Sequence, residues 1–86
     1  MIRLDFLVKS EDIPSVEEMQ RVSENGNLTI NYERVIDFAP EGYDLLVLRL
    51  IQCQRIGLKV REINISKDLR KRIKQLEFRD RGDFDE

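Results

Sequence analysis

The sequence predicts one α/β domain, in which a small, mainly parallel sheet is covered by helices in the order β-α-β-α-β-α. Three runs, residues 2–8, 28–32 and 58–65, alternate apolar and polar side chains with the period of two that is typical of a strand. Segments with helical patterns separate these runs, and another follows the last one. This alternation favours right-handed crossovers between parallel strands.

The length of the chain, 86 residues, suits one domain with a modest core, and we place this domain at residues 1–78. Residues 79–86 are charged except for Gly82 and Phe84, and we expect them to be a disordered tail. No apolar stretch approaches the roughly 20 residues that cross a membrane. Because the N-terminus also lacks the pattern of a secretion signal, we expect a cytoplasmic protein.

A short helix is expected after the first strand. Pro14 and the acidic pair Glu17-Glu18 suit its first turn. Its apolar side would consist of Val16, Met19 and Val22. Since a helix precedes Asn25-Gly26, we expect Gly26 to end that helix in a left-handed conformation, and we do not expect a hairpin turn there.

The longest apolar-rich segment, residues 43–56, predicts a central helix that ends at Gly57. The third strand, residues 58–65, changes phase at residues 61–62, which predicts a β-bulge. Ser66 is a suitable N-cap for the last helix. The apolar stripe of that helix would be formed by Leu69, Ile73 and Leu76.

The side chains argue against catalysis and against a bound metal or cofactor. Histidine is absent, which removes the commonest general base near neutral pH and a common metal ligand. Cys53 is the only cysteine, and we expect it to be an unreactive small side chain in the core. Glycine-rich phosphate loops and nucleophile-elbow motifs are also missing. We therefore expect a protein that binds a partner, and neither an enzyme nor a cofactor carrier.

Residues 28–78 carry an apolar strand, a short loop, an apolar helix that ends at glycine, another strand and a capped helix. The pieces are Leu28-Thr29-Ile30-Asn31-Tyr32, Ala39-Pro40-Glu41-Gly42, Ile56-Gly57, residues 58–65 and Ser66-Lys67-Asp68-Leu69-Arg70. This series resembles the STAS domain, the fold of bacterial anti-sigma factor antagonists. The resemblance implies a regulatory module that binds another protein through the loop and the following helix. Since Pro40 and Glu41 stand where family switches carry a phosphorylatable serine, the module would act by occupancy.

The partner-binding surface predicted in this way contains Glu41, Gly42, Asp44, Leu45, Leu48, Gln52 and Ile56. At about 100° per residue, Leu45, Leu48 and Ile56 form a second apolar side of the central helix. The side expected to meet the sheet contains Leu46, Val47, Leu50, Ile51 and Cys53. A neighbouring helix, a partner protein or a second copy of the chain would cover the second side. Glu41 and Asp44 also suit the positive end of the helix dipole without any partner, and Glu41 alternatively mimics a phosphoserine.

An alternative function is a small nucleic-acid-binding regulator. Residues 1–44 contain ten acidic and four basic residues, whereas residues 45–86 contain seven acidic and eleven basic ones. The basic set at the C-terminal end would be Lys67, Arg70, Lys71, Lys74, Arg79 and Arg81. The acidic neighbours of this set and its single aromatic residue, Phe78, favour a solvated helix face instead. A structural subunit that is stable only in an oligomer is the third alternative.

Overall fold

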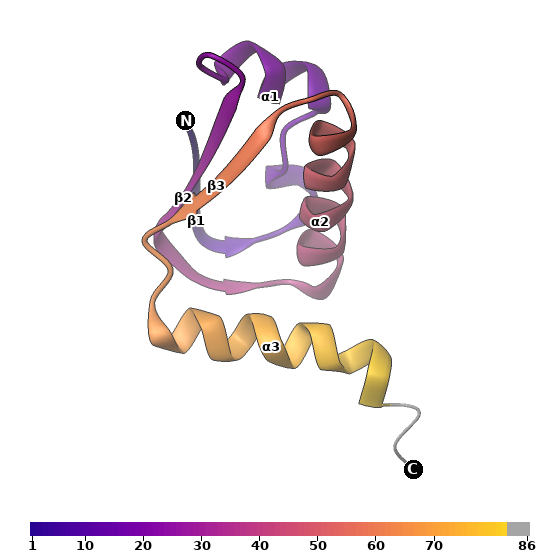
Figure 1. Cartoon of the computed structure of the whole chain (residues 1–86). Coiled ribbons are helices and arrows are strands. Elements are labelled where there is room, and N and C mark those ends of the chain that lie inside the picture. Colours follow the sequence, from indigo (N-terminus) through magenta and orange to yellow (C-terminus); the bar gives the residue numbers. More distant parts are fainter. Residues whose placement is uncertain (83–86) are drawn as a thin grey trace.

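Three parallel strands form one sheet in the order β1-β2-β3 in the computed structural model of the protein, which describes residues 1–82 (Figure 1). The strands are β1 (Ile2–Val8), β2 (Asn27–Phe38) and β3 (Lys59–Ile63). The short 3₁₀ helix η1 (Ser10–Asp12) and α1 (Val16–Val22) connect β1 to β2, and α2 (Pro40–Arg55) connects β2 to β3. The last helix is α3 (Lys67–Gly82). The predicted α/β fold class and element order are confirmed.

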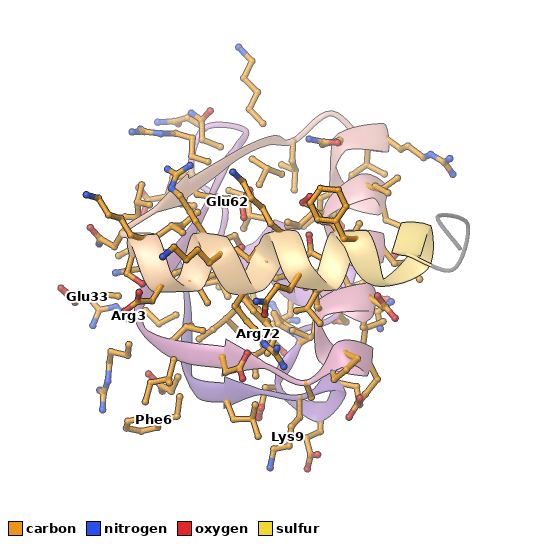
Figure 2. All side chains as sticks on the ribbon, turned by 90° about the horizontal axis from the view of Figure 1, so that it is seen from below. Arg3, Phe6, Lys9, Glu33, Glu62 and Arg72 are labelled. Atoms are coloured by element: carbon orange, nitrogen blue, oxygen red, sulfur yellow. The ribbon has the colours of Figure 1, made fainter. Side chains whose placement is uncertain are left out.

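The helices α1 and α2 lie on the same face of the sheet, as consecutive crossovers of one hand require (Figure 1). The third helix, α3, runs across the end of the sheet at which α2 begins (Figure 1). The buried apolar side chains are Ile2, Leu4, Val8, Ile13, Met19, Leu28, Ile30, Tyr32, Val35, Phe38, Leu46, Cys53, Leu69 and Leu76. No helix within residues 1–82 covers the outer face, toward which Arg3 and Glu33 project (Figure 2).

The central helix begins earlier than predicted. The sequence predicts a loop up to Gly42 and a helix from Tyr43, but α2 starts at Pro40, a position where the missing N–H of proline is not needed. Gly42 lies in the first turn and packs on the end of β1. A Cβ atom at this residue would lie only 2.4 Å from the carbonyl oxygen of Val8. Glycine therefore permits the close approach of α2 to β1.

Gly57 ends α2, as predicted, in the left-handed region with a φ of +96°. The N–H of Leu58 donates a hydrogen bond of 3.0 Å to the Cys53 carbonyl, and the N–H of Gly57 donates one of 3.1 Å to the Gln54 carbonyl. These two bonds form a Schellman motif, which satisfies carbonyls that the helix itself leaves unpaired.

The turn before β2 differs from the prediction. The helix α1 ends at Val22, before Gly26 is reached. Asn25 and Gly26 both have positive φ angles, +53° and +79°, and the flanking Glu24 and Asn27 exchange two backbone hydrogen bonds of 2.9 and 2.8 Å. Asn25-Gly26 therefore form a two-residue turn of the hairpin type, and the prediction that Gly26 ends the helix was wrong.

The bulge predicted in β3 is absent, because the pairing of β2 with β3 runs without a shift of register. The phase change in the sequence has another cause. Glu62 lies on the helix-facing side of the sheet, where it accepts a hydrogen bond from the hydroxyl of Tyr32. The apolar residue that follows, Ile63, is paired with β2 at the next position of the same regular ladder.

Irregular pairing occurs instead between β1 and β2, where the register shifts twice. Phe6 lies beside one of the shifts and has a φ of +52°, which is uncommon for a residue with a side chain. The Phe6 ring is exposed, and the Arg34 guanidinium lies over it, 5.5 Å from the ring centroid. Arg34 also forms an ion pair of 3.3 Å with Asp5. Shifts of this kind bend a strand, and β2 is visibly curved (Figure 1).

Ser66 caps α3 as predicted, since its Oγ accepts a hydrogen bond of 3.0 Å from the N–H of Leu69. The helix continues to Gly82, so residues 79–82, which the sequence assigns to a disordered tail, are helical. The remaining predicted tail, residues 83–86, lies outside the described residues.

Two buried leucines, Leu69 and Leu76, hold α3 to the sheet. Arg72 adds an ion pair of 2.6 Å with Asp37 of β2. Because both partners of this pair are partly exposed, we attribute the attachment mainly to the burial of apolar surface. Arg72 and Glu62 lie on opposite sides of α3 (Figure 2), and the side of Glu62 contains the groove described next.

Candidate protein-binding groove

A groove of about 430 Å³ lies in the angle between α2 and α3. The helix-facing side of β2 and β3 is its floor, and the two helices are its walls; Figure 1 shows them running in different directions from a corner near the start of α2. Its volume lies within the roughly 300–1,000 Å³ of typical ligand pockets. The lining residues are Tyr32, Phe38, Tyr43, Leu46, Val47, Leu50, Ile51, Gln54, Glu62, Ile65, Arg70, Ile73, Lys74 and Glu77.

The α2 wall contains two aliphatic side chains that the sequence assigns to the sheet-facing side. Leu46 and Cys53 are buried, but Val47 is 37% exposed and Ile51 is 41% exposed. The sequence-based assignment was therefore correct for the first pair and wrong for the second. The physical reason is the course of α3, which crosses the end of the sheet and leaves this flank of α2 without a parallel neighbour (Figure 1).

The floor of the groove is marked by the contact between Tyr32 and Glu62. The Tyr32 hydroxyl donates a hydrogen bond to the Glu62 carboxylate. Burial raises the pKa of Tyr32 far above its usual value, and the hydrogen bond and negative charge of Glu62 raise it further. Tyr32 therefore keeps its proton at neutral pH and acts as a hydrogen-bond donor.

A second tyrosine closes the corner between the helices. The Tyr43 hydroxyl of α2 lies 3.2 Å from Oε1 of Glu77 on α3, to which it donates a hydrogen bond. Its ring packs edge-on against Phe38, with centroids 5.6 Å apart. Burial, followed by the charge of Glu77, raises the pKa of Tyr43 to about 12. Both tyrosines thus present neutral hydroxyls that hold carboxylates in place.

The two raised pKa values predict a loss of stability at alkaline pH. Unfolded tyrosine loses its proton near pH 10.0, whereas folded Tyr43 retains its proton up to about pH 12. Above pH 10.0 the folded state consequently binds more protons than the unfolded state, so the free energy of unfolding falls as the pH rises. Urea denaturation at a series of pH values should show this fall. The fall should be smaller in Tyr32→Phe and in Tyr43→Phe than in the wild-type protein. If a variant with both substitutions lost as much stability at alkaline pH as the wild type does, the prediction would be contradicted.

Basic groups occupy the α3 rim of the groove. Arg70 and Lys74 line it, are exposed, and form no ion pair with any side chain of residues 1–78. The two carboxylates of the groove, Glu62 and Glu77, are instead hydrogen-bonded to tyrosines. The groove therefore has an apolar interior, with its acidic groups engaged and its basic groups available at one edge.

The predicted partner-binding residues are distributed along α2. Glu41 and Asp44 are exposed near its start, whereas Gly42 is buried against β1 and offers no surface. Leu45 is packed partly against the core. Leu48 and Ile56 are 48% and 49% exposed, so these two residues of the predicted second apolar side are open in the monomer. Partly buried Gln52 lies near Ile56 on the flank toward α1.

A second, more open hollow lies on that flank, between α1 and α2. It is lined by Ser15, Val16, Glu17, Arg49, Gln52, Arg55 and Ile56. Its lining has only two aliphatic side chains, Val16 and Ile56, among polar and charged groups of both signs. The Nε atom of Arg49 is buried and has no hydrogen-bond partner in the described part of the chain. The α2–α3 groove offers the more continuous apolar surface.

The predicted nucleic-acid-binding residues fall on α3. Lys67, Arg70, Lys71 and Lys74 are exposed, and their spacing places them on one side of the helix. Arg79 and Arg81 belong to the helical continuation that the sequence assigns to the tail. The basic surface predicted on α3 therefore reaches the groove at Arg70 and Lys74, whereas none of the predicted partner-binding residues of α2 lines it. The α2 wall consists instead mainly of residues that the sequence assigns to the side facing the sheet, among them Val47 and Ile51.

Comparison of the chain with protein-family models, with curated proteins and with solved structures found no match. The resemblance to STAS domains therefore stays a prediction. Among the helices of residues 1–82, none is both long and apolar enough to span a bilayer.

Sequence reasoning missed the two tyrosines and the place of Ile73 in the α3 wall. In the sequence, Tyr32 is indistinguishable from the apolar residues of an alternating strand, and Ile73 from the residues of an apolar helix side that packs in the core. The signal that could identify Tyr32 is its combination with Glu62, since a polar residue interrupts the third apolar run there. That signal is readable only once the register of β2 against β3 is known.

Proposed function

We propose that this protein is a non-enzymatic regulatory module that binds an apolar segment of a partner protein in the α2–α3 groove. The observation that carries this proposal is the set of aliphatic side chains left open on both walls. Val47 and Ile51 stand on the α2 wall, and partly buried Ile73 stands on the α3 wall. An apolar segment placed between them would bury this surface, with a gain of roughly 25 cal/mol per Å² of area removed from water.

The form of the groove supports a helical or extended segment with a few apolar anchors. Grooves between helices typically receive side chains spaced at i, i+3, i+4 and i+7 from an amphipathic partner helix. The Tyr32 and Tyr43 hydroxyls, each held by a carboxylate, stiffen the floor and the corner. Less ordering is then required on binding, which favours affinity. If the chain acts like a STAS domain, the regulatory signal would be whether the groove is occupied by the partner or empty. The protein would act in the cytoplasm, where Cys53 stays reduced.

The experiment compares two double variants of the full chain. Val47→Asp with Ile51→Asp places charge in the groove, whereas Leu48→Asp with Ile56→Asp places the same charge on the opposite flank of α2. All four side chains are substantially exposed, so both variants should fold, as circular dichroism and urea denaturation would show.

The probe is a displayed library of random peptides selected on the wild-type protein. Selected peptides should bind the groove variant at least about tenfold more weakly than wild type, because charged groups would replace central apolar contacts. The opposite-flank variant should bind them as wild type does. Selected peptides that bind the groove variant normally, or a selection that yields no peptide, would exclude this function. Loss confined to the opposite-flank variant would move the binding surface to Leu48 and Ile56.

A further inference from the structure

We infer that the partner segment is acidic on one side, and that a basic strip along α3 recognises its carboxylates; this inference rests on the proposed function. The strip consists of Lys67, Arg70, Lys71 and Lys74, all of which are exposed. At about 100° per residue the four side chains fall within one side of the helix, and Arg70 and Lys74 also line the groove. A segment seated in the groove would therefore pass beside the strip.

The positive charge of the strip is not cancelled within the described part of the chain. The ion pairs among the side chains of residues 1–78 join Arg34 to Asp5 and Arg72 to Asp37, and neither contains a residue of the strip. On the groove side of α3, Glu77 is engaged by the Tyr43 hydroxyl. The four cations are accordingly available to a ligand of opposite charge.

The carboxylates inside the groove restrict where the partner can carry its acidic groups. Glu62 on the floor and Glu77 in the corner would repel an acidic group placed deep in the groove. Apolar side chains fit the interior instead, between Val47 and Ile73. The complementary segment thus has apolar anchors on one face and acidic residues on the adjoining face, toward α3. Nucleic acid would satisfy the strip through its phosphates but would leave the apolar walls uncovered, so we favour the acidic peptide.

The test uses three libraries of amphipathic helical peptides with the same randomised apolar positions. The flanking positions on one side are all Glu, all Gln or all Lys. Binding to the purified full chain should decrease in that order, with about tenfold between the Glu and Lys libraries, because exposed ion pairs contribute modestly and several act together. The advantage of the Glu library should shrink as salt is added.

The decisive variant is Arg70→Glu with Lys74→Glu, which should reverse the order of the libraries. Arg21→Glu with Lys59→Glu makes the same change of charge at exposed positions outside the groove and should leave the order unchanged. If all three libraries bind equally and lose binding in the Val47→Asp, Ile51→Asp variant, the acidic partner is excluded while the proposed function stands. If no library binds, the proposed function fails. Binding of a short single-stranded RNA by the strip, with no peptide bound, would replace both proposals by nucleic-acid binding.

Discussion

Gly42→Ala should destabilise the fold by about 2 kcal/mol, although alanine is normally preferred to glycine in a helix by up to about 1 kcal/mol. The added Cβ would lie 2.4 Å from the Val8 carbonyl oxygen and 2.9 Å from the Cα of Lys9. Both neighbours are backbone atoms, which cannot move aside as the end of a flexible side chain can. The start of α2 must therefore shift away from β1, and urea denaturation should show the loss.

The control for this variant is Gly57→Ala. Gly57 has a φ of +96°, but a Cβ there would meet no atom within 4 Å. This variant measures the cost of left-handed conformation alone, which is roughly 1 kcal/mol. A Gly42→Ala protein at least as stable as wild type would show that α2 does not pack on the end of β1 as described.

Leu69→Ala should cost about 2–5 kcal/mol, the range measured when a buried leucine is truncated. Leu69 is 1% exposed and lies in the first turns of α3, at the sheet. Its loss should also weaken binding of the peptides selected on the wild-type protein, because the α3 wall of the groove would no longer be held in place. Urea denaturation and a peptide titration measure the two effects.

Phe78→Ala is the matched control on the same helix. Phe78 is a large apolar residue but is 57% exposed, so its truncation should change stability by no more than about 0.5 kcal/mol. Equal and small effects of both substitutions would mean that α3 is not attached through its leucine stripe.

The features that the sequence predicts correctly are those determined by neighbouring residues. Ser66 and Gly57 are recognisable because capping depends on a side-chain oxygen or on the absence of Cβ at one position. The strand periods and the helices between them then determine the parallel order. The wrong predictions depend on competition between local alternatives. Asn25-Gly26 suit both a helix end and a tight turn. The two backbone hydrogen bonds between Glu24 and Asn27 favour the turn.

The groove could be predicted only in part, because it depends on the relative placement of elements that are distant in sequence. The apolar excess of α2 correctly indicates that Leu48 and Ile56 are uncovered. The periodicity does not indicate that Val47 and Ile51, which it assigns to the sheet, line the groove. Their place in the groove depends on α3, whose position follows from the burial of Leu69 and Leu76 against the sheet. Tyr32 and Glu62 are 30 residues apart and meet only through the register of β2 and β3. Such information is three-dimensional and is not contained in a local pattern.

The irregular course of β1 also determines how this small sheet ends. A strand at the border of a sheet offers unpaired amide and carbonyl groups to any extended chain that approaches. The left-handed Phe6 and the nearby shifts of register break the even spacing that a new strand would need along β1. On the opposite border, the exposed Lys59 and Arg61 place positive charge along the short β3. Uncontrolled strand addition is therefore disfavoured at both borders, which leaves the helical side as the face best suited to selective association.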